Sequence, residues 1–163
     1  MSAVGFVQRL DAVEERLAGH AATAPQQGAL TSADPGSGER WDAGQVWAHL
    51  AEFVPYWIGQ AQLVMTAYDD EPVPFGRTKT DTARVAAIER DRGQLLAVLW
   101  TDVHTDIERL RQFLMGIDAG MWHVRGLHPT MGVMDLERII DDFLVGHLEQ
   151  HADQLDELTR DGG

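Results

Sequence analysis

Apolar residues recur at steps of three and four positions in four separate stretches of this chain, and this spacing restricts its fold more than any other feature. The period is typical of amphipathic helices that bury one face. The stretches cover about residues 4–18, 42–68, 80 or 81 to an end before 116–120, and 136–158. Because no stretch is a convincing strand, the pattern predicts an all-α fold in which four helices form a bundle.

The second predicted helix carries the clearest start signal. Asp42 is a good N-cap, and Gln45 three residues later completes a capping box. Trp41 is placed to pack on Val46 across the first turn. Pro55 removes a backbone donor inside this helix, so we expect a kink there.

Segments rich in Gly, Pro, Ser and Asp separate the predicted helices. They predict a long surface loop over residues 22–40, a crossover loop over 69–79 and a second irregular stretch between 116 and 135. The length of 163 residues suits one domain that covers residues 1–163.

Charge and composition exclude several classes of function. The net charge of −13 repels nucleic-acid phosphates, so we expect no nucleic-acid partner. No cysteine is present, which excludes disulfides, thiolate ligands and a cysteine nucleophile. No apolar stretch approaches the ~20 residues that cross a bilayer. The N-terminus also lacks the basic start and apolar run of a secretory signal, so we expect a cytoplasmic protein without membrane contact.

Three histidines are predicted to face the interior of the bundle. His147 and His151 are four residues apart on the fourth helix, a spacing that lets two imidazoles share a metal. His49 lies between Val46 and Phe53 on the apolar face of the second helix. Neutral imidazoles suit zinc, nickel, copper or ferrous iron, and three of them leave at least one position for water or substrate.

Each of these histidines could also occur without a metal. A lone helical histidine is more often structural, and a pair at this spacing is often a surface coincidence, so the prediction depends on the three together. His20, His104 and His123 are expected to be solvated, helix-end or packing residues. The zinc-protease motif is rejected because Glu149 does not directly follow His147.

Gly146, immediately before His147, is expected to remove side-chain bulk near the metal, although a glycine inside a helix costs about 0.5–1 kcal/mol relative to alanine. That cost indicates close packing or access at this position.

Two segments resemble a known family. The run Trp41-Asp42-Ala43-Gly44-Gln45-Val46-Trp47-Ala48-His49-Leu50 resembles the tryptophan-to-histidine start of the second helix in DinB-like proteins. The run His128-Pro129-Thr130-Met131-Gly132, followed by Gly146-His147 to His151 and Gln154-Leu155, is similar to the closing half of the same superfamily. The likeness covers about residues 4–158, and the superfamily includes the metal-binding domain of mycothiol-dependent maleylpyruvate isomerase.

The resemblance implies a bundle of up-down-down-up topology, in which His49, His147 and His151 bind zinc, nickel or a similar divalent ion such as iron. It also implies a thiol-dependent reaction, since characterised relatives use the metal to activate a low-molecular-weight thiol for transfer or isomerisation. We do not expect maleylpyruvate itself as the substrate, because the sequence carries no equivalent of the additional C-terminal domain usual in those isomerases.

The leading hypothesis is therefore a metal-dependent thiol S-transferase or isomerase that acts on a small-molecule electrophile with a mycothiol-type cosubstrate. Trp122 and Arg125 are expected to line the thiol pocket, and Glu52 either orients a ligand or is a surface charge. Two alternatives stay open: a metal-dependent hydrolase, and a noncatalytic metal-binding or dimerisation bundle. A homodimer is plausible in either case.

Overall fold

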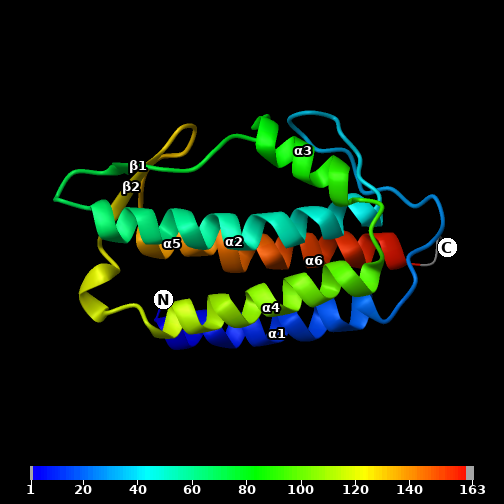
Figure 1. Cartoon of the computed structure of the whole chain (residues 1–163), viewed down its shortest axis with the longest axis horizontal. Helices are drawn as coiled ribbons and strands as arrows, with labels where there is room; N and C mark the ends of the chain where they lie inside the picture. Colours follow the sequence, from blue (N-terminus) through cyan, green and yellow to red (C-terminus); the bar gives the residue numbers. More distant parts are fainter. Residues whose placement is uncertain (1, 161–163) are drawn as a thin grey trace.

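Four long helical segments lie side by side in a bundle in the computed structural model, which describes residues 2–160 (Figure 1). The helices are α1 (Ala3–Ala21), α2 (Ala43–Ala67), α3 (Thr82–Asp91), α4 (Leu96–Met115), α5 (Leu136–Ile140) and α6 (Gly146–Thr159). A 3-10 turn, η1 (Ala119–Met121), follows α4, and a π-helical segment, η2 (Asp141–Val145), joins α5 to α6. The short strands are β1 (Val73–Pro74), β2 (Arg125–His128) and β3 (Gly132–Asp135).

The bundle consists of α1, α2, α4 and the continuous segment α5–η2–α6. Helices α1 and α2 each pack against both α4 and α6. Figure 1 shows that α1 and α6 run in one direction and that α2 and α4 run in the other, so the predicted up-down-down-up topology is confirmed. The largest fully buried side chains are Phe6, Phe53, Leu10, Leu17, Leu50, Ile107, Leu110, Leu114, Met134, Leu136, Ile139 and Ile140.

The capping box predicted for the second helix is present. The Asp42 carboxylate accepts a hydrogen bond from the Gln45 backbone N–H at 2.8 Å, and the Gln45 side chain accepts one from the Asp42 N–H at 3.0 Å. Helix α2 then continues through Pro55 to Ala67. This pair of bonds fixes the start of the helix that carries His49.

The single third helix predicted from residue 80 onwards is wrong, because the chain forms α3 and α4 with a break between them. The Arg92 carbonyl lies so close to Gly44 that a Cβ on Gly44 would overlap it, and the Arg92 guanidinium pairs with Asp42 at 2.7 Å. These contacts tie the end of α3 to the start of α2. In the sequence, Val85 and Leu95 continue the apolar spacing of a single helix, although both side chains are exposed in the structure. The spacing therefore did not reveal the break between the two helices.

The expectation of irregular structure between residues 116 and 135 holds only in part, because residues 125–128 and 132–135 form strands and residues 119–121 a 3-10 turn. Strand β2 pairs antiparallel with β3 and parallel with β1, with Val73 opposite Gly126. Gly132 turns the hairpin with a positive φ of 73°, a conformation that glycine adopts readily. The strands have only two to four residues, which is too short for an alternating pattern to stand out.

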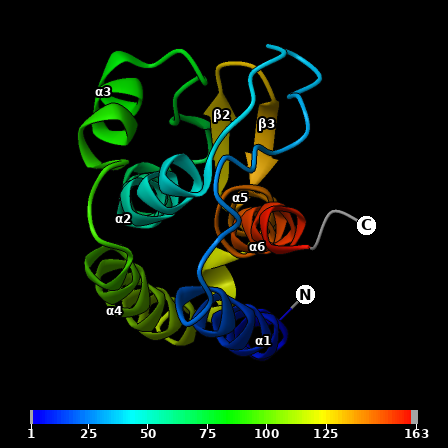
Figure 2. The ribbon, with the colours of Figure 1, turned by 90° about the vertical axis from the view of Figure 1, so that its right-hand side faces the viewer.

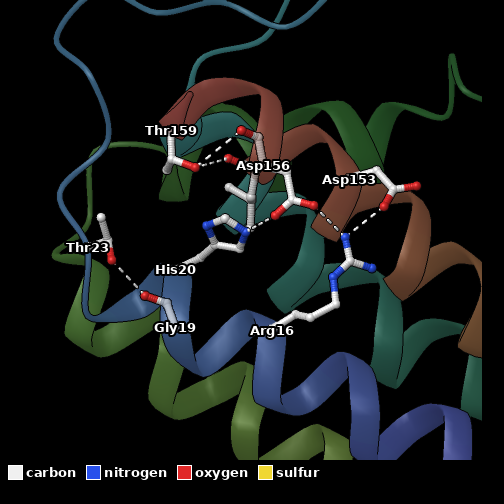
Figure 3. Close-up of polar contacts among 8 residues, drawn as sticks. Arg16, Gly19, His20, Thr23, Asp153, Asp156 and Thr159 are labelled. Atoms are coloured by element: carbon white, nitrogen blue, oxygen red, sulfur yellow. Dashed lines mark hydrogen bonds and ion pairs between the residues drawn. The ribbon is translucent and has the colours of Figure 1, made fainter. Parts of the chain in front are cut away.

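One side of the bundle carries an additional layer. Figure 2 shows α3, the β2–β3 hairpin and the loop that precedes α2 together on the side of α2 and α6, whereas α1 and α4 lie on the opposite side. Polar contacts hold α6 against α1: Arg16 forms ion pairs with Asp153 and Asp156, each at 2.7 Å, and His20 is hydrogen-bonded to Asp156 at 2.6 Å (Figure 3). Helix α6, which carries His147 and His151, is thereby fixed on its outer side.

Gly146 lies where the π-helical segment ends. Its backbone N–H donates to the Asp141 carbonyl, five residues earlier, and a Cβ at position 146 would overlap that same carbonyl oxygen. The close contact is therefore with Asp141 and not with the histidines, contrary to expectation. Glycine at this position permits the π-helical geometry that precedes His147.

We expect Gly146→Ala to lower the free energy of unfolding by about 1–3 kcal/mol, because the added methyl group overlaps the Asp141 carbonyl. The matched control is Gly59→Ala in α2, where nothing lies within 4 Å of an added Cβ; that change is expected to stabilise by about 0.5–1 kcal/mol. Urea denaturation of both variants measures the difference. Equal stability changes would show that the π-helical segment does not require glycine.

Among the described residues, none of the helices is both long and apolar enough to span a membrane.

Candidate metal centre

Three imidazoles converge between α2 and α6. His49 comes from α2, whereas His147 and His151 lie one turn apart on α6. One ring nitrogen from each lies within 4.8 Å of the others, and the two Nε2 atoms of His49 and His147 are 3.3 Å apart. His49 and His151 are buried and His147 is half-buried. The structure therefore brings together the three histidines singled out in the sequence.

Hydrogen bonds orient two of the three rings. His49 Nδ1 donates to Glu52 Oε1 at 2.9 Å, and His151 Nδ1 contacts the Gln154 side-chain oxygen at 2.7 Å. A carboxylate only accepts, so the proton of a neutral His49 is on Nδ1, and the Gln154 oxygen places that of His151 there as well. The Nε2 lone pairs are thereby left free to bind a metal, and the metal-ligand histidines of proteins are commonly fixed in this way.

The donor set fits a divalent transition metal. Nitrogen ligands at about 2.0–2.1 Å from a tetrahedral ion are about 3.3–3.4 Å apart, which matches the separation of the His49 and His147 Nε2 atoms. In the part of the chain that the structure describes, the buried Nε2 of His151 and Nδ1 of His147 have no hydrogen-bond partner. A buried polar atom without a partner is costly, and a metal would supply one at His151.

The environment keeps the three imidazoles neutral. Burial is the main cause that holds the pKa values of His49 and His147 well below the usual 6.5. The second cause is the repulsion that a protonated imidazole would meet from a neighbouring histidine. Burial lowers the pKa of His151 to about 4. Neutral imidazole is the form that binds metal, so the set is ready for coordination at neutral pH.

These shifts predict how the stability of metal-free protein depends on pH. Because the folded-state pKa values are lowered, the unfolded chain binds more protons as the pH falls below about 6.5, and stability is lost from there towards pH 4. We expect the urea midpoint of chelator-treated protein to fall between pH 7 and pH 5, and to fall less in His151→Leu. An identical dependence in His151→Leu would contradict the assignment.

Glu52 connects the histidines to a buried arginine. Arg77 Nη2 donates to both Glu52 oxygens at 2.6 Å, and the Arg77 guanidinium lies 3.8 Å from the centroid of the Tyr56 ring. Burial raises the pKa of Glu52, and the contact with Arg77 opposes this rise. Glu52 is buried in contact with His49, which is a position where it can orient a ligand; it is not a surface charge.

A pocket of about 750 Å³ opens beside the three histidines. Its walls come from α2, α3, α6, the loop before α2 and the β2–β3 turn. Trp41 lies in the wall and contacts two of the imidazoles, stacking on His151 at 6.3 Å between ring centroids and meeting His49 edge-on at 5.3 Å. Trp57 and Phe143 make a second aromatic contact in the wall, stacked at 4.2 Å. The pocket is large enough for a small molecule.

The expectation that Trp122 and Arg125 line this pocket is wrong. Trp122 stacks on Phe6 at 6.0 Å, and Arg125 is exposed and donates to the Asp70 carbonyl at 3.0 Å. Successive side chains of β2 point to opposite faces, which explains the position of Arg125: Gly126 and His128 are buried while Arg125 is exposed. Because the sequence predicted no strand in this stretch, it could not predict which of its side chains are buried.

Sequence reasoning missed three other residues that line the pocket. Arg77 and Arg84 lie in the crossover segment and on α3, where no pattern indicated a role. His128 was noted only as part of the family-like run; its Nδ1 accepts hydrogen bonds from the Thr130 and Met131 N–H groups, both at 3.2 Å. Burial lowers the pKa of His128.

Comparison with known proteins identifies the fold. No protein-family model matches the chain, and no curated protein matches it. Among solved structures, YfiT from Bacillus subtilis matches with a TM-score of 0.75 and 19% identity, over 97% of this chain and 86% of that one. It is described as a probable metal-dependent hydrolase with an unusual four-helix bundle topology. The likeness shows the fold: this chain has the same four-helix bundle architecture as YfiT, which agrees with the bundle predicted from the sequence.

Proposed function

We propose that this protein binds one divalent transition metal, zinc or nickel before iron, through His49, His147 and His151, and that it activates a low-molecular-weight thiol for attack on a small electrophile. It would thus be a metal-dependent S-transferase or isomerase of the mycothiol type. The observation that carries the proposal is the convergence of three buried or half-buried imidazoles beside an open pocket. The bound metal would supply Lewis acidity that lowers the pKa of the thiol.

The number of ligands favours an enzyme over a structural staple. Structural zinc sites are closed by four protein ligands, whereas catalytic sites keep a position for a small molecule. Within residues 2–160, the group of His, Cys, Asp and Glu side chains able to share an ion contains only the three histidines. The adjacent pocket provides the room that a substrate requires.

The acceptor atoms of Glu52 and His128 near the site already have hydrogen-bond partners, and this favours a thiol over water as the nucleophile. A thiol that coordinates a metal loses its proton without a protein base, whereas activation of water benefits from one. Glu52 already accepts from both His49 and Arg77, and the Nδ1 atom of His128 already accepts two backbone hydrogen bonds. Since the chain has no cysteine, the thiol would come from a cosubstrate.

A metal-dependent hydrolase is the second candidate, and the description of YfiT favours it. Both candidates use the same three histidines. They differ in the nucleophile that the site must hold, and this difference can be measured.

The test compares thiol conjugation with hydrolysis on zinc-loaded and nickel-loaded protein. Monobromobimane with mycothiol, bacillithiol or glutathione reports conjugation, and p-nitrophenyl acetate without thiol reports hydrolysis. We expect thiol conjugation that depends on metal and is lost in His147→Ala, while His104→Gln keeps it. Hydrolysis that is equally metal-dependent, with no thiol conjugation above background, would select the hydrolase. Rates that are unchanged in His147→Ala would reject both.

A further inference from the structure

Arg84 lies on α3 and lines the same pocket as the histidines, next to Val85 and Ile88 of its own helix. Its Nη1 donates to the Lys79 carbonyl at 2.7 Å, and its guanidinium lies 5.6 Å from the centroid of the Trp41 ring. Helix α3 belongs to the layer that covers the α2 and α6 side of the bundle (Figure 2). The arginine is therefore held in place at the pocket wall by a carbonyl and an indole.

No carboxylate pairs with this arginine. In the described part of the chain, Arg77 pairs with Glu52 and Arg92 with Asp42, whereas Arg84 belongs to no ion pair and feels the charge of Glu52 only at longer range. This is notable in a chain with 26 acidic and 13 basic residues. Arg84 is half-buried, and burial lowers its pKa, although a guanidinium stays charged. A partly desolvated guanidinium without a paired carboxylate is a place where an anion binds favourably.

The position of Trp41 relates this charge to the histidines. The same indole lies against the Arg84 guanidinium and stacks on the imidazole of His151. The positive charge of Arg84 also contributes to lowering the pKa values of His49 and His147, as expected for neighbouring groups. Arg84 and the three histidines line the same pocket, so one bound molecule can contact both.

From these contacts we infer that Arg84 and Trp41 form a subsite for a carboxylate, and that the substrate carries a single carboxylate on an apolar body. The inference rests on the proposed function in naming its substrate class. With Nη1 bound to the Lys79 carbonyl, the free donors of one guanidinium suit one carboxylate. Apolar groups surround the subsite in Trp41, Val85 and Ile88.

The charges at the outer part of the pocket disfavour a dianion such as phosphate. Asp34, Glu39 and Glu89 line this region, and Lys79 is already paired with Asp34 at 2.7 Å. Glu89 is likewise paired with Arg92 at 2.9 Å, so a dianion would meet one guanidinium outside any ion pair together with the carboxylate of Glu39, which has no ion pair within the described residues. A monoanionic carboxylate is repelled less and keeps its bond to Arg84.

The test measures binding of phenylacetate and its neutral analogue phenylacetamide to chelator-treated protein by isothermal titration calorimetry. We expect wild type to bind the acid about tenfold more tightly than the amide, because a charge-assisted hydrogen bond is lost in the amide. The preference should vanish in Arg84→Gln and survive in part in Arg84→Lys. Arg90→Gln is the matched control, since Arg90 lies on the same helix, is exposed and is paired with Asp91.

Equal binding of acid and amide by wild type, or an unchanged preference in Arg84→Gln with a native circular dichroism spectrum, would overturn the subsite. Because these titrations use metal-free protein, they stand or fall separately from the metal proposal. A repeat with zinc-loaded protein separates the two sources of affinity. A preference that appears only with zinc and persists in Arg84→Gln belongs to the metal and would also overturn the subsite.

Discussion

Replacing His147 or His151 with alanine is expected to weaken metal binding by about 10²–10³-fold. Structural zinc sites with four ligands have apparent binding free energies of about 10–16 kcal/mol, so each ligand accounts for about 2.5–4 kcal/mol. Neither side chain has a replacement, since no fourth His, Cys, Asp or Glu joins the group within the described residues. Competition with a chromophoric chelator measures the affinity.

The control for this experiment is His104→Ala on α4, because His104 is exposed and pairs with Glu14. It should bind metal as wild type does. Circular dichroism spectra check that the variants keep their helices. Wild-type affinity in either His147→Ala or His151→Ala would contradict the assignment of that residue as a ligand.

Glu52→Ala is expected to have a double effect. It leaves Arg77 buried without its carboxylate, which lowers the free energy of unfolding by about 3–5 kcal/mol. It also removes the acceptor that orients His49, which weakens metal binding by about 10–100-fold. Urea denaturation of metal-free protein measures the first effect, and chelator competition measures the second.

A second variant separates the two effects of Glu52. Combining Glu52→Ala with Arg77→Met removes the unpaired buried charge, so most of the lost stability should return. Metal affinity should remain low, because His49 still lacks its acceptor. If affinity returned together with stability, Glu52 would act only through folding and not by orienting His49.

The histidine site was predictable because its geometry depends on short-range order. A spacing of four residues places His147 and His151 on one face of any regular helix. The apolar neighbours of His49 fixed which way it faces, and the capping box at Asp42 fixed where its helix starts. None of these inferences requires knowledge of how distant segments pack.

The remainder of the pocket depends on contacts between distant segments. The break after α3 follows from the approach of Arg92 to Gly44, about fifty residues away in sequence, and no local signal marks it. Arg77 and Arg84 reach the pocket because the crossover segment folds back over α2, and their helical or loop context alone assigned them no role. Arg125 was misplaced because a four-residue strand leaves almost no periodicity to detect. Trp122 follows the short turn η1 and packs on Phe6 of α1, a contact between segments far apart in the sequence.

Trp41 contacts both the histidines that the sequence predicted and the pocket residue Arg84 that it did not. It was predicted to pack on the first turn of α2, and it contacts His49, His151 and Arg84. Trp41 contacts two of the proposed metal ligands and is part of the proposed carboxylate subsite, so the two proposals share this residue. The position of Trp41 beside His49, His151 and Arg84 gives it this part in both proposals.

The most direct test of the central claim is the metal content of tag-free protein, measured by plasma mass spectrometry after dialysis against mixed zinc, nickel and ferrous ions. We predict about one equivalent of divalent transition metal per chain in wild type, and almost none in the double variant His147→Ala/His151→Ala. Wild-type protein that retains no metal under these conditions would contradict the account and leave a helical bundle with three unexplained inward-facing histidines.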